Sequence, residues 1–149
     1  ASDAIDAVAP LAHKKQITLV NEIKRGYAVF DRERILQVLI NLLSNAIKFS
    51  PERSSIEIQS TSMHNKLIVT VCDHGAGMTQ AERRKLFQKF YQAKGGKEAG
   101  GSGLGLAICK LIIDSHGGNI GVDSTPGEGS KFWFSIPLEA AASEESETV

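Results

Sequence analysis

The segment from Asp31 to about Phe49 constrains the fold more than any other part of the sequence. Its apolar residues recur at helical spacing and cover most of the circumference, so we expect a largely buried helix. Asp31 is expected to cap its start, and Ser50-Pro51 to end it, because the residue before a proline disfavours helical angles. The apolar positions are Ile35, Leu36, Val38, Leu39, Ile40, Leu42, Leu43, Ala46 and Ile47.

One stripe of this helix is polar, and amides make up most of it. Gln37, Asn41, Asn45 and Lys48 follow at intervals of four, four and three residues, which places them on one helical face. A solvated surface would also explain a polar stripe, but such surfaces favour Lys and Glu. Because amides on a largely buried helix need hydrogen-bonding partners, the stripe favours a ligand site.

The rest of the chain alternates short strands, turns and helices. A capping box at Thr79–Glu82 predicts a helix to about Phe90. We expect strands at 17–20, 27–30, 55–60, 67–72, 119–124 and 131–136, a helix at 104–115 with a stop at 116–118, turns at 64–66 and 126–129, and a mobile Gly-rich loop at 94–102. This order predicts an α+β fold, a two-layer α/β sandwich whose helices cover one face of a mixed, mainly antiparallel sheet.

Composition excludes several classes of protein. The 149 residues suit one domain with a core that needs no metal or disulfide, and 17 basic against 17 acidic residues argue against nucleic-acid binding. No apolar run approaches the ~20 residues of a membrane span, and the first residues lack a signal-peptide pattern. Cys72 and Cys109 match no metal or redox spacing and are expected to be buried thiols. We expect one domain over residues 1–140 and a disordered acidic tail over 141–149.

Two glycine-rich motifs are candidate binding segments. In Asp73-x-Gly75-x-Gly77, the carboxylate can accept a hydrogen bond from an exocyclic amine, and the glycines let a ligand approach the backbone. Taken alone, an ordinary Asp-Gly turn explains this motif better, because such a string is common. The segment 101–106 opens a helix, where backbone amides can bind phosphate, although a flexible linker is the alternative. This segment matches neither a Walker loop nor the dinucleotide fingerprint.

In their order and spacing, these motifs together resemble the conserved boxes of the sensor histidine kinases. Residues 41–49 resemble the N box, 73–78 the first glycine box, 86–90 the F box, 101–106 the second glycine box and 125–130 the closing Gly-rich hairpin. The similarity extends over residues 17–138. It implies the catalytic ATP-binding domain of the GHKL (Bergerat) fold, with a flexible ATP lid.

The resemblance implies a role for each motif residue. Asn41, Asn45 and Lys48 would be catalytic, with Asn45 binding Mg²⁺ and the other two contacting phosphates or the ion's waters. Asp73 would bind the adenine amino group of ATP, beside Gly75 and Gly77. The remaining implied contacts are Gly101, Gly103, Leu104, Gly105 and Leu106 in the second glycine box, Lys94 and Lys97 in the lid, and Phe87 and Phe90 at its near end. Plain core aromatics explain the two phenylalanines nearly as well.

The resemblance also implies partners. In the family an acidic residue and then a proline follow the acceptor histidine, and none of the chain's histidines (His13, His64, His74 and His116) has that context. We therefore expect transfer to the dimerisation and histidine-phosphotransfer domain of the same parent protein, with a response regulator receiver domain downstream. We expect a cytoplasmic domain without membrane contact, whose parent can be anchored in the inner membrane.

Two positions refine this interpretation. Gyrase-type ATPases carry a glutamate general base where this chain has Asn41, and an amide cannot act as a base, so a kinase is favoured over a hydrolase. Gln92 stands where many family members have an arginine, which leaves the γ-phosphate to Lys94 or Lys97. A degenerate nucleotide-binding regulatory module without catalysis is the alternative function.

Overall fold

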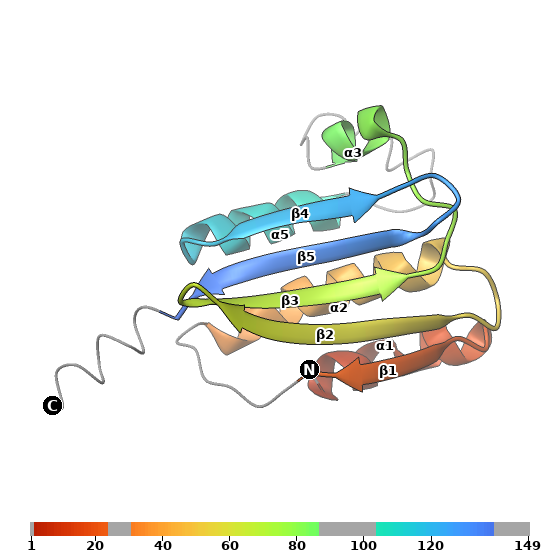
Figure 1. The fold of residues 1–149 in the computed structure, drawn as a ribbon. Helices are drawn as coiled ribbons and strands as arrows, with labels where there is room; N and C mark the ends of the chain where they lie inside the picture. Colours follow the sequence, from red (N-terminus) through yellow and green to blue (C-terminus); the bar gives the residue numbers. More distant parts are fainter. Residues whose placement is uncertain (1, 24–30, 87–103, 139–149) are drawn as a thin grey trace, which may run out of the picture.

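A computed structural model describes residues 2–23, 31–86 and 104–138. In these ranges the strands form one sheet in the order β1-β2-β3-β5-β4, with β1 parallel to β2 and all other neighbours antiparallel. Helices α1, α2 and α5 lie on one face of the sheet (Figure 1). The elements are α1 (Ser2–Lys14), β1 (Thr18–Glu22), α2 (Arg32–Phe49), β2 (Ser55–Met63), β3 (Lys66–Asp73), α3 (Gln80–Leu86), α5 (Leu104–Ser115), β4 (Asn119–Ser124) and β5 (Ser130–Pro137). The expected two-layer α+β sandwich is confirmed.

The hydrophobic core fills the space between the helices and the covered face of the sheet. Alternate residues of β2, β3 and β5 point into it, as the period of a strand requires. From the helices come the apolar positions of α2, a row of small residues on α1 and one face of α5. The main contributors are Ile56, Ile58, Val69, Val71, Phe132, Phe134, Ile136, Val38, Leu42, Leu43, Ala46, Ala4, Val8, Ala12, Leu106, Cys109 and Ile113.

The helix caps and the helix stop that the sequence predicts are present in the structure. The side chain of Asp31 accepts from the backbone N–H of Arg34 and caps α2. The capping box of α3 is reciprocal, since Thr79 N–H donates to Glu82 Oε1 and Glu82 N–H donates to Thr79 Oγ1. After α5, Gly117 takes a φ of 72°, and the next amide donates back to the carbonyl of Ile113 at 3.0 Å.

Other parts differ from the sequence-based expectation or lie outside the described residues. Residues 2–14 form α1, a helix that the sequence pattern does not predict. β1 runs over Thr18–Glu22 rather than 17–20, and Ile17 lies outside the strand because its N–H donates to Ala12 O of α1 at 2.9 Å. The expected strand at 27–30, the loop at 94–102, the helix end near Phe90 and the tail at 141–149 are outside the described ranges. None of the described helices combines the length and hydropathy needed to cross a bilayer.

Candidate nucleotide site

Asp73 ends β3 with its carboxylate held by two backbone amides. The side chain is only 6% exposed, and Oδ1 accepts from Gly75 N–H at 2.9 Å and from Ser130 N–H at 3.2 Å. Both bonds end on the same oxygen, which leaves Oδ2 as the acceptor for a further donor. Burial raises the pKa of this carboxyl, while the two amides and nearby His74 act in the opposite direction. The result is an oriented, desolvated acceptor at the end of the sheet.

The glycines after Asp73 allow close backbone packing. A Cβ on Gly75 would lie 2.6 Å from the carbonyl oxygen of Phe49, and one on Gly77 would overlap the carbonyl of Thr125. Gly77 also has a φ of 75°, which favours glycine. Gly127 N–H donates to Ala76 O at 2.6 Å. This motif is therefore fitted between the end of α2 and the β4–β5 turn.

Two serines hold that turn against the site, and the sequence did not single them out. The hydroxyl of Ser124 donates to Gly129 O at 3.0 Å and accepts from Met78 N–H at 2.8 Å. Because its one proton is used, the hydroxyl of Ser130, 2.8 Å away, donates to it. The sequence shows only a serine at each end of a Gly-rich turn, and this pattern is too common to indicate a role for either residue.

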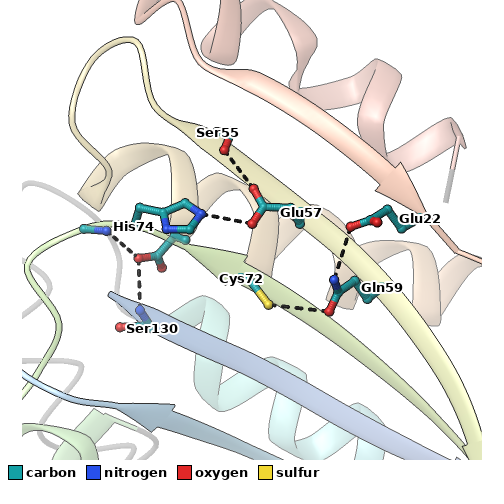
Figure 2. A network of polar contacts seen from close by, with 9 residues as sticks. Glu22, Ser55, Glu57, Gln59, Cys72, His74 and Ser130 are labelled. Atoms are coloured by element: carbon teal, nitrogen blue, oxygen red, sulfur yellow. Dashed lines mark hydrogen bonds and ion pairs between the residues drawn. The ribbon is translucent and has the colours of Figure 1, made fainter. Parts of the chain in front are cut away.

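A line of polar contacts runs along the outer face of the sheet beside Asp73. Figure 2 shows His74 turned towards Glu57 of β2, with 2.9 Å between Nε2 and Oε1. Ser55 donates its hydroxyl to the other oxygen of the same carboxylate at 2.9 Å. The contact therefore links the residue after Asp73 to the neighbouring strand, on the face away from the helices.

The polar stripe of α2 lies along the same helix that ends beside Gly75. Asn41 and Asn45 are half-buried, whereas Gln37 and Lys48 are exposed, so the amides are less enclosed than the sequence suggested. Asn41 Nδ2 lies 3.6 Å from Cys109 Sγ of α5. Nothing among the described residues groups three or more His, Cys, Asp or Glu side chains as a metal site.

Phe49 is a further residue of this region that the sequence did not single out as a contact. The residue is 60% exposed at the end of α2, and Lys48 Nζ lies 5.4 Å from the centroid of its ring. Its carbonyl adjoins Gly75. An exposed aromatic ring is a surface on which another planar ring can stack. The available signal was an aromatic directly after the polar stripe.

The second glycine box is only partly described. Gly101 and Gly103, with Phe87, Phe90, Lys94 and Lys97, lie outside the described residues. Leu104 and Gly105 form the first turn of α5, where backbone amides lack helical partners. Leu106 is buried in the core, so its side chain packs the helix while only its backbone is available to a ligand.

Comparison with known proteins gives consistent results. The family model of "Histidine kinase-, DNA gyrase B-, and HSP90-like ATPase" matches residues 30–140. The Sensor protein GacS of Pseudomonas syringae pv. syringae is 43% identical over 99% of this chain, which spans 17% of that protein. The adaptive-response sensory kinase SasA of Rippkaea orientalis is 36% identical over 91% of the chain, which spans 36% of that protein.

Solved structures are also similar. The nucleotide-free catalytic domain of histidine kinase ThkA gives a TM-score of 0.80 at 34% identity, with 92% of this chain and 89% of that one covered. Full-length ShkA, solved in complex with AMPPNP, gives a TM-score of 0.78 at 28% identity. The match covers 92% of this chain and 29% of that one. ThkA has also been solved in complex with response regulator protein TrrA, with a TM-score of 0.74 at 31% identity, covering 92% and 39%.

Proposed function

Because the chain belongs to the family of histidine kinase-, DNA gyrase B- and HSP90-like ATPases, we propose that it binds Mg-ATP and transfers the γ-phosphoryl group to a histidine. The acceptor would lie on a separate dimerisation and phosphoacceptor domain of the same parent, and a receiver domain would follow. We place this step in the cytoplasm. The observation that carries the proposal is the arrangement of Asp73, whose Oδ1 is occupied by two amides while Oδ2 remains for a ligand donor.

The adenine end of the nucleotide fits around Asp73. An exocyclic amine would donate to Oδ2, in a setting where desolvation strengthens the bond. Gly75 and Gly77 lack a Cβ, so the backbone after Asp73 can pack closely against Phe49 and Thr125, and the exposed Phe49 offers a stacking surface. A carboxylate acceptor favours ATP, whose base has an exocyclic amine, over a nucleotide whose base has a carbonyl in place of that amine.

The phosphate end fits along α2 and the first turn of α5. Asn41, Asn45 and Lys48 lie on one face of α2, and the amides at Leu104 and Gly105 start α5. Helix N-termini bind phosphate through such amides. Magnesium held at Asn45 would neutralise charge on the phosphate oxygens, and phosphoryl transfer depends mainly on such positioning and neutralisation.

The four histidines support an acceptor outside this chain. Nε2 of His74 is bonded to Glu57, and both ring nitrogens of His116 are engaged, by Asp31 N–H at 3.0 Å and by Ile112 O at 2.8 Å. His64 lies in the β2–β3 turn with a φ of 51°, and His13 is in the last turn of α1. None of them lies on the polar stripe of α2.

Calorimetric titration of ADP and a non-hydrolysable ATP analogue, with Mg²⁺ and with EDTA, tests nucleotide binding. We expect binding by the wild type that strengthens with Mg²⁺. Asn45→Ala should raise the Kd at least about tenfold in Mg²⁺, as is typical for loss of a metal contact, and remove the difference from EDTA. Asn119→Ala, an exposed amide on β4, is the matched control and should bind as the wild type does. Absence of binding at millimolar nucleotide would favour a regulatory module.

Radiolabelled transfer tests the reaction. With ATP labelled at the γ-phosphate and a supplied acceptor-domain hairpin, a kinase labels the hairpin's histidine. Steady phosphate release without an acceptor would instead indicate a hydrolase. The amide at Asn41 argues against a hydrolase, because an amide cannot act as a general base. Binding without either reaction would leave the regulatory module as the function.

A further inference from the structure

Lys15 joins the end of α1 to the end of α2. Its Nζ donates to three backbone carbonyl oxygens, those of Ile47 at 2.9 Å, Lys48 at 3.2 Å and Ser50 at 2.6 Å. An ammonium has three protons, so these bonds use every donor of the side chain. The side chain is half-buried, which reduces competition from water.

The three carbonyls need such a partner. The last four carbonyls of an α-helix have no intrahelical donor and carry the negative end of the helix dipole. A cation placed there satisfies the oxygens and offsets the dipole. α2 ends without the usual left-handed glycine, since Ser50 is extended at a φ of −89°. Lys15 therefore substitutes for a local C-cap with a side chain from another element.

The same turn of α2 forms one wall of the nucleotide site. Between the carbonyls that Lys15 binds, that of Phe49 adjoins Gly75, where an added Cβ would lie 2.6 Å from the oxygen. The amide of Gly75 in turn donates to Asp73 Oδ1. Asn45 lies one turn earlier on α2. The position of this turn thus affects the adenine acceptor and the magnesium ligand together.

The backbone around Lys15 is also held in place, so its side chain starts from a fixed point. Arg53 N–H donates to Lys15 O at 3.0 Å, Thr18 N–H donates to Ser54 O at 3.0 Å, and Arg53 Nε donates to Gln16 Oε1 at 3.0 Å. These bonds join the α1–β1 turn to the α2–β2 turn. The start of α1 is paired with the start of α2 through Asp3 and Arg32.

We propose that Lys15 is a positioning residue for nucleotide binding: its ammonium holds the last turn of α2 where Gly75 and Asp73 can present Oδ2 to the base. The effect on nucleotide affinity rests on the proposed function. The effect on the conformation of the Gly75 loop is independent of that function, because it follows from contacts within the protein. α1, which contributes no residue to the site itself, would in this way control the site's geometry.

The test compares Lys15→Met, which keeps the length of the side chain and removes the ammonium, with Lys15→Arg and with Lys14→Met. Lys14 is the exposed neighbour and serves as the matched control. Two quantities are measured at a temperature where every variant is folded. One is the Kd for Mg-ADP, and the other is the hydrogen-exchange rate of the Gly75 amide in the nucleotide-free protein, followed by NMR.

We expect K15M to raise the Kd for Mg-ADP roughly tenfold, the lower end of the range for mutating residues that support metal ligands, and to speed exchange at Gly75. K15R should restore both, and K14M should match the wild type. A lower thermal midpoint of K15M with wild-type Kd and wild-type exchange would overturn the proposal and leave Lys15 as a helix cap only.

Two further outcomes are also decisive. If the wild type itself does not bind ADP, the proposed function fails, and exchange at Gly75 alone decides whether Lys15 positions the loop. If K15M does not fold, Lys15→Gln, which retains an amide donor without charge, is measured in the same two ways. Unchanged exchange at Gly75 overturns the proposal in either case.

Discussion

At Asp73, burial and hydrogen bonding shift the pKa of one carboxyl in opposite directions. Desolvation dominates, so the pKa lies above its ordinary value of 3.8 despite the amides of Gly75 and Ser130. Between the ordinary and the raised pKa, the native state binds more protons than the unfolded state, so the Asp73 contribution to stability falls as pH rises. The ionised form of this carboxyl is therefore held in the native state at a cost in stability, which is typical of binding residues.

Asp73→Asn separates binding from stability. The amide oxygen of the variant can still accept from Gly75 and Ser130, so the loop should keep its conformation. Its Nδ2 would then face the adenine amine, donor against donor, and the Kd for ADP should rise at least about tenfold. The free energy of unfolding at pH 7, from urea titration, should be no lower than in the wild type. A large loss of stability would show instead that the charge itself holds the loop.

Nucleotide binding should also depend on pH through the same carboxyl. Because the bound amine needs the ionised form, the Kd for ADP should increase as pH falls through the raised pKa of Asp73. Calorimetry at pH values below about 7.5 at which the protein stays folded measures this, and the pH dependence should be weaker in the Asp73→Asn variant, where only other groups, such as the ADP phosphate, titrate. A parallel rise in the variant would assign the pH dependence to another group.

Some residues of the candidate site are indicated by local sequence patterns, and others are recognised only from the tertiary structure. Asn41 and Asn45 are candidates because their spacing places them on one face of a helix, whereas Asp73 is a candidate only through the order and spacing of all the motifs together. The contacts of Ser124 and Lys15 could not be predicted, since their partners are distant in the chain and depend on how the elements pack.

Among the elements, the β4–β5 turn and the first glycine box are interlocked. Gly77 and Gly129 both have positive φ, and an added Cβ on either would overlap backbone across the contact, that of Thr125 or of Asp73. The amide of Gly127 closes the same contact by donating to Ala76 O. The turn after β4 is therefore part of the site's scaffold.

A pair of glycine substitutions separates backbone strain from crowding. Gly77 and Gly127 have φ of 75° and 83°, but no atom lies within 4 Å of a Cβ built on Gly127. Gly127→Ala should cost about 1 kcal/mol, the strain of a left-handed residue. Gly77→Ala should cost several times more, because the backbone of Thr125 must also move, and should weaken ADP binding. Urea unfolding measures both, and equal costs would contradict the interlocked arrangement.

Elements with strong local signals could be predicted, and those held by tertiary packing could not. α2, the capping box of α3 and the stop after α5 are marked by periodicity and capping residues. α1 contains Pro10 and buries only the small side chains of Ala4, Val8 and Ala12, so its pattern is weak. Packing against α2 stabilises it where propensity does not.

At the scale of the whole molecule, polar contacts among the described residues join α5 to α2 across the helical layer. Cys109 Sγ lies between Asn41 Nδ2 at 3.6 Å and Val38 O at 3.9 Å. At the other end, Asp31 N–H donates to His116 Nε2 at 3.0 Å, so Nδ1 carries the proton that is donated to Ile112 O. These contacts keep the helix that follows the second glycine box in register with the helix that carries the amides.

The buried thiol makes the stability of the domain sensitive to alkali. Cys109 is fully buried, and desolvation raises its pKa from 9.0 to about 11. A raised pKa stabilises the native state below pH 9, and this contribution is lost as pH rises towards 11, where the native thiol must also ionise. The wild type should lose about 2 kcal/mol more than Cys109→Ala between pH 8 and pH 11.

Urea titrations at several pH values measure that difference. Cys109→Ala leaves a cavity, so its stability should be lower at every pH, but its decline with pH should be shallower. Cys72→Ala retains Cys109 and should keep the steeper decline attributable to it. Parallel curves for the wild type and Cys109→Ala would mean that water reaches the thiol in the native state. The α2–α5 contact would then open transiently in the native state, and both helices would be less rigid than their packing indicates.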